Sequence, residues 1–486
     1  MFLDTEVQNQ VTALGRRLAK LREVFTESGN SLYLVGGSVR DLLLGDDIIS
    51  ERRVDESSYD GVDAIDFDFT TNCLPEVTKE LLLPIAEAIW DVGAAYGTVA
   101  ARIRGLTIEI TTHRGDVYRE DSRKPVVTMP TTLEEDLVRR DFRMNAMAID
   151  FLSDQPALVD PFGGVRDIQE RLIATPRDPV QSFEDDPLRM LRAVRFAAKL
   201  DFRLDEGIVA AVNSMIDRLD IVSAERIRGE IDKLLLTNRP SIGLRLMTET
   251  GLAAKVLPEL PALALEQDPI HHHKDVLEHT YSVVDKTYPD LVLRLAALFH
   301  DVGKPRTRKF EKGGVTFYNH DIVGSKMTKK RMRELKYSTE TINAVSRLVY
   351  LHLRFHTYQA GWTDKAVRRY VSDAGELLDR LNALTLADCT TRNANKVRAL
   401  EDRMVELKER IVELREREEL DSLRPEIDGI KVMEILEIGP SRQVGEALSF
   451  LMDIRLDEGL LGEEEVISRL KAWWVERGNS SIHENE

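Results

Sequence analysis

The spacing of apolar residues predicts a helix, a strand and a turn at the start of the chain. From Leu3 to Phe25 apolar residues recur at helical intervals, and Leu32 to Val35 form a short apolar run. Two glycines end this run, which is typical of a buried strand that leads into a turn. Ser38 then has the side chain to cap a short helix that ends at Gly45.

Alternation of apolar and polar residues predicts further strands, and helical spacing takes over in the second half of the chain. The predicted strands are Ala64–Phe69, a hairpin of Thr98–Ile103 with Leu106–Thr111, and Ala146–Phe151. From about Pro187 helices dominate, with loops expected near Pro258–Pro269, Lys312–Gly314 and Leu423–Gly429. The pattern predicts an α+β fold class, with a small mixed sheet in an N-terminal head followed by an all-α neck and body.

Length and composition narrow the class of protein. A chain of 486 residues exceeds what one hydrophobic core normally supports, so roughly two to four domains are expected. No apolar run approaches the roughly 18 residues that span a bilayer, and the N-terminus lacks the basic and apolar parts of a signal peptide. Cys73 and Cys389, the only cysteines, form no disulfide or thiolate-metal pattern. We therefore expect a cytoplasmic protein without a membrane partner.

The formal charge of −17 argues against a nucleic-acid partner at first, because Lys and Arg supply most of the affinity for phosphate. The charge is unevenly distributed, however. Acidic residues concentrate in the C-terminal part, where Glu401–Leu420 predicts a charged helix that is solvated or bridges other parts. The segments Lys304–Lys309 and Lys326–Lys336 are locally basic, which leaves room for a basic track on an acidic body.

Two aspartates in the segment DFDFTT have the spacing of a metal site. Asp66 and Asp68 lie two residues apart on a predicted strand, so both carboxylates project from the same face. Mg²⁺ prefers carboxylate oxygens together with substrate phosphates, and a two-metal site activates a hydroxyl while stabilising a leaving pyrophosphate. On its own, the same pattern also fits a solvated strand surface.

Segments on either side of the aspartates offer groups that bind phosphate. Gly36 and Gly37 let backbone N–H groups approach a triphosphate at the start of a helix, and Arg40 adds charge. Further along, RRDFRMNAMAID places polar side chains just before a strand, where they can bind phosphate or ribose or form a charged surface loop. These residues are Arg139, Arg140, Asp141, Arg143 and Asn145.

The segment EDDPLRMLRAVRF predicts a helix with charged groups along one face. Pro187 fits the first turn, and the three-residue spacing of the charged positions aligns their side chains. The positions are Asp186, Arg189, Arg192 and Arg195. A solvent-facing charged stripe is the alternative reading of this pattern.

Taken together and in order, these segments resemble the bacterial tRNA CCA-adding enzyme and poly(A) polymerase family of polymerase-beta-like nucleotidyltransferases. The resemblance covers roughly Leu32–Ile231 and rests on LVGGSVRDLLLG, DFDFTT, EITTHR, RRDFRMNAMAID, DPFGGVRDIQERLIAT, DPLRMLRAVRFAAKL and SAERIRGEI. It implies that Asp66 and Asp68 bind magnesium, that the glycine turn holds the triphosphate and that the RRDF segment contacts the nucleotide sugar. Glu109, in EITTHR, matches an acid that is either a third catalytic carboxylate or structural.

The resemblance also assigns base selection to Asp186 and Arg189, which match the EDxxR motif that pairs with the incoming base. A carboxylate accepts from the exocyclic amine of C or A, and a guanidinium donates to an unprotonated ring nitrogen. Such a protein template accepts CTP and ATP and rejects the other nucleotides. One departure is visible, because Asp185 stands where the motif has Glu.

Within this family, the sequence favours addition of CCA to the tRNA 3′ end over poly(A) synthesis. Poly(A) polymerases of this family typically carry a basic-aromatic stretch of the GRRF kind between the DxD and RRDF motifs. The corresponding region here, AAYGTVAARIRGLTIEITTHR, is similar to the CCA-adding version. A poly(A) polymerase remains the first alternative.

Most of the chain's histidines lie in an order that resembles the HD phosphohydrolase domain. Imidazole and carboxylate suit several first-row divalent metals, so the resemblance implies a second metal site of open metal identity. Its expected ligands are His279, His300, Asp301, His320, His352 and Asp388. His320 and His352 match the additional ligands of HD domains that hold two metals.

Such domains typically hydrolyse phosphoesters through a metal-activated water, which predicts trimming or 2′,3′-cyclic phosphodiesterase activity on RNA ends. A vestigial body that only grips RNA is the alternative. Lys304 and Arg306 beside the His-Asp pair steer phosphate or form a solvated loop, and His271, His272, His273 and His356 are expected to be peripheral. A second rival for the whole chain is an HD phosphohydrolase whose head only binds RNA.

We expect four domains along the chain. They are a nucleotidyltransferase head at 1–155, a helical neck with the base-recognition helix at 156–265, the HD domain at 266–400 and a C-terminal helical tail at 401–486. The predicted reaction is in-line attack of the RNA 3′-hydroxyl on the nucleotide α-phosphate, with Mg²⁺-pyrophosphate leaving.

Overall fold

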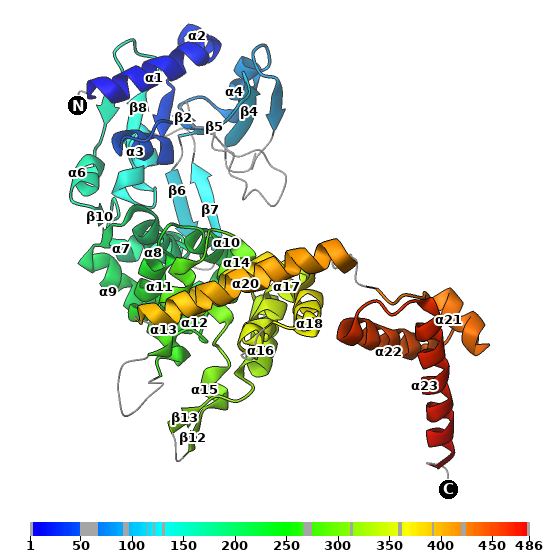
Figure 1. Cartoon of the computed structure of the whole chain (residues 1–486). Helices are drawn as coiled ribbons and strands as arrows, with labels where there is room; N and C mark the ends of the chain where they lie inside the picture. Colours follow the sequence, from blue (N-terminus) through cyan, green and yellow to red (C-terminus); the bar gives the residue numbers. More distant parts are fainter. Residues whose placement is uncertain are drawn as a thin grey trace. The chain divides into compact units, whose positions relative to one another are not determined.

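The computed structural model describes residues 3–48, 67–90, 97–113, 115–119, 122–128, 132–265, 275–311, 314–357, 362–390, 393–418 and 424–483. The chain divides into two compact units, Met1–Leu257 and Pro258–Glu486. Figure 1 shows most of the strands in the N-terminal unit and a second unit that is helical apart from the short β12 (Lys309–Glu311) and β13 (Gly314–Thr316), as the α+β prediction requires. Among the described residues, no helix is long and apolar enough to cross a membrane.

A seven-stranded mixed sheet forms the head of the first unit. Its strand order is β3-β4-β5-β2-β1-β8-β9. Strand β2 is parallel to β5, and the other neighbouring strands of this sheet are antiparallel. The strands are β1 (Tyr33–Val35), β2 (Phe67–Thr71), β3 (Ala88–Trp90), β4 (Thr98–Ile103), β5 (Leu106–Thr112), β8 (Ala148–Asp150) and β9 (Leu158–Val159). The predicted hairpin is confirmed, with β5 one residue longer than expected. The predicted strands at 32–35 and 146–151 are confirmed with shorter ends, whereas β3 and β9 were not predicted.

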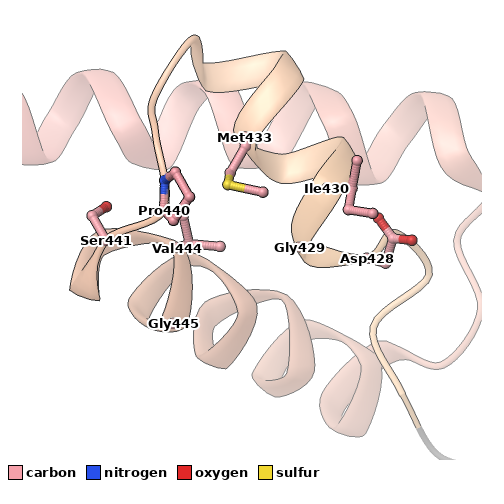
Figure 2. A pocket seen from close by; sticks show the side chains of 8 residues that line it. All are labelled: Asp428, Gly429, Ile430, Met433, Pro440, Ser441, Val444 and Gly445. Atoms are coloured by element: carbon pink, nitrogen blue, oxygen red, sulfur yellow. The ribbon is translucent and has the colours of Figure 1, made fainter.

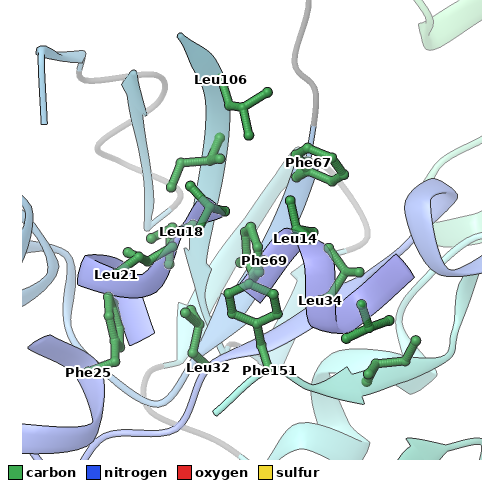
Figure 3. Close-up of a cluster of buried hydrophobic side chains, with 14 of the residues drawn as sticks. Leu14, Leu18, Leu21, Phe25, Leu32, Leu34, Phe67, Phe69, Leu106 and Phe151 are labelled. Atoms are coloured by element: carbon green, nitrogen blue, oxygen red, sulfur yellow. The ribbon is translucent and has the colours of Figure 1, made fainter. Parts of the chain in front are cut away.

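Two N-terminal helices cover one face of this sheet and form its core. Leu14, Leu18 and Leu21 pack with alternate residues of the strands, such as Phe67 and Phe69 of β2 (Figure 3). Because strand side chains alternate between faces, the residues between these core positions lie on the opposite face. The core therefore determines which face carries the polar residues of the site.

The predicted helix from Leu3 to Phe25 is wrong in one respect, because it is two helices. These are α1 (Thr5–Arg17) and α2 (Ala19–Glu27), and the chain breaks at Leu18 with φ −102° and ψ 31°. Apolar spacing alone did not reveal the break, since Leu18 keeps the buried position that an unbroken helix would give it.

The predicted cap at Ser38 is also wrong. Helix α3 (Gly37–Leu43) begins one residue earlier, and its N-cap is Gly36 with φ +72°. This left-handed conformation is readily adopted by glycine and costs other residues free energy. The glycine turn thus starts the helix without a side-chain cap.

The remaining helices of the first unit belong to the head, to the neck or to the junction between them, and α4 packs on strands β4 and β5 of the head. They are α4 (Pro75–Leu82), α5 (Leu133–Val138), α6 (Gly164–Gln169), α7 (Pro179–Asp185), α8 (Arg189–Leu200), α9 (Glu206–Met215), α10 (Ala224–Leu235), α11 (Pro240–Glu249) and α12 (Leu252–Val256). Two small sheets accompany them, a β6 (Gly115–Arg119) and β7 (Ser122–Thr128) hairpin and a parallel pair of β10 (Leu172–Ile173) and β11 (Arg203–Leu204). Pro187 lies two residues before α8 rather than in its first turn, because Asp186 is still extended at φ −144° and ψ 100°.

The second unit is helical, as predicted. Its helices are α13 (Val276–Lys286), α14 (Leu291–Phe299), α15 (Lys304–Thr307), α16 (His320–Glu334), α17 (Thr339–Leu351), α18 (Asp364–Ala374), α19 (Leu378–Asp388), α20 (Ala394–Glu418), α21 (Gly429–Leu436), α22 (Arg442–Glu458) and α23 (Glu463–His483). The expected loop near Lys312–Gly314 falls between β12 and β13, which pair antiparallel, and residues 312–313 lie outside the described residues. The described parts of the other two expected loops, 258–265 and 424–428, contain no α-helix.

The charged helix α20 is not simply solvated, because one of its faces is buried. Its inner face carries Leu400, Met404, Leu407, Ile411 and Leu414. Glu418 at its end is 8% exposed and accepts hydrogen bonds from Arg368 of α18 and Arg455 of α22. The helix therefore bridges the HD helices and the terminal helices, which was one of the two predicted roles.

The last three helices have their own small core, and α21 and α22 border a pocket (Figure 2). The pocket is lined by Asp428, Gly429, Ile430, Met433, Pro440, Ser441, Val444 and Gly445. Asp428, its one carboxylate, accepts from the backbone N–H of Lys431 at 2.9 Å and so caps α21. The lining offers no group of residues for metal binding or proton transfer.

Candidate active sites

Two acidic side chains lie side by side on the polar face of the head sheet. Asp68 of β2 is directly opposite Glu109 of β5 in the parallel register, and the neighbours of each along its own strand belong to the core. Burial raises the pKa of Asp68 despite nearby Arg140, and burial together with Asp68 raises the pKa of Glu109 to about 7. Two carboxylates that are costly to ionise together are prepared for a cation. Asp66 lies outside the described residues.

The glycine turn approaches these carboxylates closely. A Cβ placed on Gly36 would lie 3.4 Å from Asp68 Oδ2 and 3.2 Å from Arg140 Nη1. Arg140 donates from Nη2 to Asp136 at 3.3 Å, while its buried Nε has no hydrogen-bond partner among the described residues. The Gly36 backbone, the Asp68 carboxylate and the Arg140 guanidinium therefore lie close together, which suits binding of a metal-bound phosphate.

Asp136 holds the two arginines of the RRDF segment, and sequence reasoning did not single it out. Its fully buried carboxylate binds Arg139 Nε at 3.0 Å as well as Arg140. Burial acts to raise the pKa of Asp136, but the two arginines outweigh it and hold the pKa below its usual value. Thr70 links Asp136 to His113 Nδ1, at 3.4 and 2.9 Å, and burial lowers the pKa of this histidine. The segment DLVRRDF contained the signal, since an acid three and four residues before two arginines faces both on a helix.

Asp141 joins the head to helix α8. Its Oδ1 accepts from Asn145 Nδ2 at 3.0 Å, and its Oδ2 accepts from Arg192 Nε at 2.9 Å. Asn145 in turn accepts from Arg40 Nη1 at 2.7 Å, and Arg40 also pairs with Asp41. Burial acts to raise the pKa of Asp141, but Arg192 outweighs it and holds the pKa well below the usual range. Arg40 is only 3% exposed, so its bonds to Asn145 and Asp41 stabilise the glycine turn from within the protein.

The charged residues on and before α8 each have a partner in the protein. Arg189 donates to the Ser182 hydroxyl at 2.8 Å and to the Arg139 carbonyl at 2.5 Å, and Asp186 pairs with Arg226 at 2.7 Å. Arg195 donates to Glu230 at 2.5 Å. Arg226 and Glu230, both in the SAERIRGEI segment, are partners that sequence reasoning did not name. Asp185, which stands where the family motif has Glu, pairs with Arg177.

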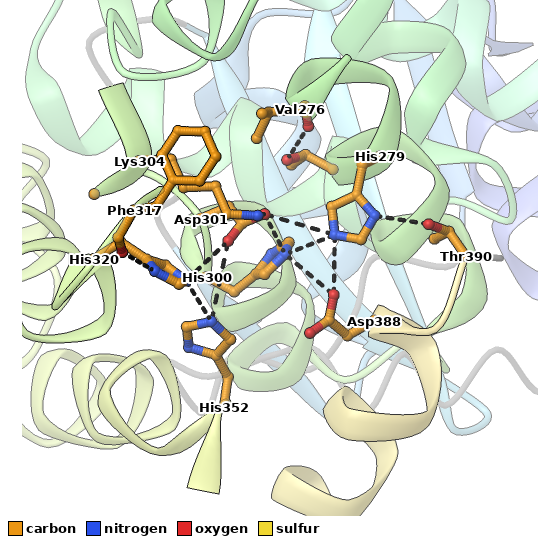
Figure 4. A network of polar contacts seen from close by, with 12 residues as sticks. Val276, His279, His300, Asp301, Lys304, Phe317, His320, His352, Asp388 and Thr390 are labelled. Atoms are coloured by element: carbon orange, nitrogen blue, oxygen red, sulfur yellow. Dashed lines mark hydrogen bonds and ion pairs between the residues drawn. The ribbon is translucent and has the colours of Figure 1, made fainter. Parts of the chain in front are cut away.

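The second candidate site lies where four helix ends meet in the HD region. His300 and His352 follow the ends of α14 and α17, His320 begins α16, and Asp388 ends α19. His279 comes from the first turns of α13 and Asp301 follows His300. All six predicted ligands therefore converge (Figure 4).

Asp301 stands between two groups of histidines. Its Oδ2 lies 3.2 Å from His300 Nε2 and 3.6 Å from His279 Nε2, while its Oδ1 lies 3.4 Å from His320 Nε2 and 4.0 Å from His352 Nε2. Asp388 completes the first group at 2.9 Å from His279 Nε2. Two clusters with one shared carboxylate are the arrangement expected for two metal ions.

Backbone carbonyls fix the orientation of three of the imidazoles. Nδ1 of His300, His320 and His352 lies 2.7 to 2.8 Å from the carbonyl oxygens of Ala297, Phe317 and Val349. A carbonyl only accepts, so each Nδ1 carries the proton and Nε2 presents a lone pair to the cluster. The Nε2 atoms meet pairwise, at 3.1 Å for His279–His300 and 3.2 Å for His320–His352. Facing lone pairs repel unless a cation or proton lies among them.

Electrostatics agree with a site for positive charge. Burial opposes the charged forms, but His300 and Lys304 hold the pKa of Asp301 well below its usual range, and Asp301 raises the pKa of His300. Burial and the neighbouring His300 lower the pKa of His352 to about 4, which keeps it neutral as a metal ligand must be. The donor set fits divalent metals.

Lys304 belongs to this site, whereas Arg306 is exposed beside it. Lys304 Nζ donates to Asp301 Oδ2 at 2.6 Å. His356 is half-buried and has no hydrogen bond to the six predicted ligands among the described residues. The positions 271–273 lie outside the described residues.

Comparison with known proteins extends over nearly the whole chain. The Poly A polymerase head domain matches residues 32–174, the probable RNA and SrmB-binding site of polymerase A matches 201–263, and the HD domain matches 270–393. An A-adding tRNA nucleotidyltransferase of Deinococcus radiodurans is 32% identical over 75% of this chain and 85% of its own. A CC-adding tRNA nucleotidyltransferase of Thermus thermophilus is 31% identical over 91% and 93%.

The chain belongs to the tRNA nucleotidyltransferase family. The fold agrees, because the Bacillus stearothermophilus CCA-adding enzyme, solved in complex with CTP, superposes with a TM-score of 0.68 over 96% of this chain and 99% of its own at 24% identity. Nucleotidyltransferase heads and HD domains generally depend on divalent metals, and this tRNA nucleotidyltransferase contains both. The individual site residues and the four domain boundaries remain predictions.

Proposed function

We propose that this tRNA nucleotidyltransferase adds CCA to the 3′ end of tRNA, with CTP and ATP as substrates and Mg²⁺ at the head. The observation that carries the proposal is the meeting of Asp68, Glu109, Gly36 and Arg140 on one face of the head sheet. The relatives support it, since they include A-adding, CC-adding and CCA-adding enzymes. Action on tRNA also supports a cytoplasmic location.

In this mechanism Asp68, with Asp66, holds Mg²⁺, which would activate the RNA 3′-hydroxyl and neutralise the leaving pyrophosphate. Glu109 adds negative charge beside Asp68. The turn at Gly36 and Gly37 lets the triphosphate approach the backbone, and Arg140, whose Nη1 lies beside the turn, can donate to a phosphate oxygen. The chain therefore supplies positioning and charge rather than a covalent intermediate.

Base selection falls to Asp186 and Arg189 in our proposal. Each has a protein partner here, Arg226 for Asp186 and Ser182 with the Arg139 carbonyl for Arg189. An incoming C or A would exchange for these partners at similar geometry, because both offer an amine donor and a ring-nitrogen acceptor. Arg192 and Arg195 are held by Asp141 and Glu230 and keep α8 in place.

The decisive experiment is to incubate the protein with Mg²⁺, tRNA lacking its last three nucleotides, and each nucleoside triphosphate alone or mixed, and to sequence the products. Two C residues followed by one A, lost in Asp68→Ala, would support the proposal. Addition that stops at CC, or A added only to a tRNA ending in CC, would reassign the chain to a single-specificity enzyme. An open-ended A tail would favour the poly(A) alternative, and no addition would favour the HD alternative.

For the HD region we propose metal-dependent hydrolysis of phosphoesters at RNA ends. The inward-facing Nε2 atoms around Asp301 support this over a vestigial body, because a merely structural core has no need to set four imidazoles nitrogen to nitrogen. The measurement is release of phosphate from RNA 3′-phosphate and opening of 2′,3′-cyclic phosphate with Mn²⁺, Co²⁺, Ni²⁺ or Mg²⁺ added. Protein that binds no metal and cleaves no phosphoester would reduce the domain to an RNA-gripping body.

A further inference from the structure

A short segment next to the HD cluster exposes two aromatic side chains. Phe310 of β12 is 71% exposed and Tyr318, just after β13, is 66% exposed. Exposing an aromatic ring to water costs free energy. Two exposed rings near a reactive centre therefore indicate a binding surface. We name the described residues of this segment, 304–311 and 314–318, the hairpin platform.

Both ends of the hairpin platform are fixed to the metal cluster. At its start Lys304 donates to Asp301, and near its end the Phe317 carbonyl accepts from His320 (Figure 4). Lys304 Nζ also lies 5.6 Å from the centre of the Phe317 ring. A Cβ on Gly303 would lie 2.1 Å from the His320 carbonyl oxygen, so the backbone is in contact there. A ligand on the platform is therefore beside the histidines.

The charge of the platform is positive on an acidic protein. Arg306, Arg308 and Lys309 precede Phe310, and the Arg308 guanidinium lies 4.7 Å from the Phe310 ring centre. Glu311 is the acid among the described residues of the two short strands. Helix α16, which packs on α15, continues the positive charge along its exposed positions Lys326, Lys330 and Arg333.

We propose that the hairpin platform binds the single-stranded 3′ end of an RNA and holds its terminal phosphate at the HD cluster. Phe310 and Tyr318 stack on unpaired bases, and the cations bind the backbone phosphates. Two separate rings are too few for a stable protein interface, which needs about 800 Å² on each side. The inference rests on the proposed hydrolase activity for its biological meaning, and its binding step is testable without that activity.

Binding is measured on the full chain in EDTA, by fluorescence anisotropy of a 12-nucleotide unpaired RNA with a 3′-phosphate. Phe310→Ala with Tyr318→Ala is expected to raise Kd about tenfold, as expected for the loss of base stacking. Phe310→Trp is expected to retain wild-type affinity and Phe310→Leu is not, which distinguishes stacking from general apolar contact. The matched control is Tyr288→Ala, because Tyr288 is 48% exposed and precedes α14, whose opposite end carries His300.

A photo-crosslinking residue at position 310 locates the RNA independently. It is expected to capture the last nucleotides of the oligonucleotide, whereas the same residue at position 288 captures none. Equal affinity of wild type and the Phe310/Tyr318 double variant, or crosslinks at 310 no stronger than at 288, would overturn the platform. Equal competition by a fully paired duplex would overturn the stacking on unpaired bases.

Catalysis separates this inference from the proposed hydrolase function. A 2′,3′-cyclic mononucleotide carries no base beyond the one at the reacting phosphate for Phe310 and Tyr318 to stack on, so its hydrolysis is expected to be unchanged in the double variant. Hydrolysis of the oligonucleotide at low concentration is expected to fall about tenfold. If no substrate is cleaved, the hydrolase proposal fails while the anisotropy and crosslinking results still decide whether the platform binds RNA.

Discussion

The head site and the HD site both suit cations, but they differ in the ionisation state of their carboxylates before a cation binds. In the head, burial raises the pKa of both Asp68 and Glu109, so the carboxylates resist ionisation until positive charge arrives. In the HD cluster Asp301 is already ionised and backbone carbonyls hold the histidines with Nε2 inward. A site of adjacent strands gains its ligands from sheet register, whereas a site of helix ends must fix each ligand separately.

The comparison predicts that the two sites are chemically independent. Asp68→Asn is expected to lower nucleotide addition about 10³-fold or more, because a metal ligand is lost from a two-metal reaction, and to leave phosphoester hydrolysis intact. Asp301→Asn, which removes the carboxylate shared by both histidine groups, is expected to do the reverse. Both activities are measured on each variant, and loss of both in either single variant would show that the sites act as one.

The junction between the head and α8 is expected to be the most sensitive structural point of the first unit. Asp141→Asn removes the buried carboxylate that Arg192 binds and leaves this arginine only the more distant Glu230 at 3.8 Å. Because Arg192 is itself partly exposed, the loss is expected to cost about 1.5–3 kcal/mol, as for a hydrogen bond between charged groups. Hydrogen exchange in α8 and β8 is expected to speed up, and discrimination of CTP and ATP against the other nucleotides is expected to weaken.

The matched control for this junction is Glu170→Gln. Its pair with Arg166 is exposed to solvent and contributes little to stability. Equal exchange rates in the two variants would show that the Asp141 network does not hold the helix.

Local sequence patterns predicted which residues belong to each site, but they did not predict which residues these contact. The alternation in DFDFTT placed Asp68 on the face away from the core, and the order of the histidine motifs predicted six ligands that do converge. Partners distant in sequence were missed, such as Glu230 for Arg195, because they depend on how α8 and α10 pack. The cap at Ser38 was misjudged, since the positive φ of Gly36 is a property of the turn and not of residue spacing.

Metal is expected to stabilise the HD helices. A metal that binds only the folded state at 100 times its Kd adds about 2.7 kcal/mol of stability. Hydrogen exchange in α13, α14 and α17 is therefore expected to slow when Mn²⁺ is added to metal-free wild type and to Asp68→Asn, but not to Asp301→Asn. Slowing of equal size in Asp301→Asn would show that the cation binds elsewhere.

The smallest expected effect is a pH-dependent gain in stability when Glu109 is replaced by Gln in metal-free protein. The pKa of Glu109 is about 7 in the folded state and near 4.5 ordinarily, so its stabilising contribution is complete below pH 4.5 and is lost as pH rises through 7. Glu109→Gln is therefore expected to equal wild type near pH 4.5 and to be about 1 kcal/mol more stable at pH 8, a value discounted because the side chain is partly exposed. Hydrogen exchange in β2 and β5 measures the difference. Mg²⁺ is expected to remove it by stabilising the ionised carboxylates of wild type. A gain that is equal at both pH values, or that Mg²⁺ leaves unchanged, would show that Glu109 is a structural residue rather than part of the cation site.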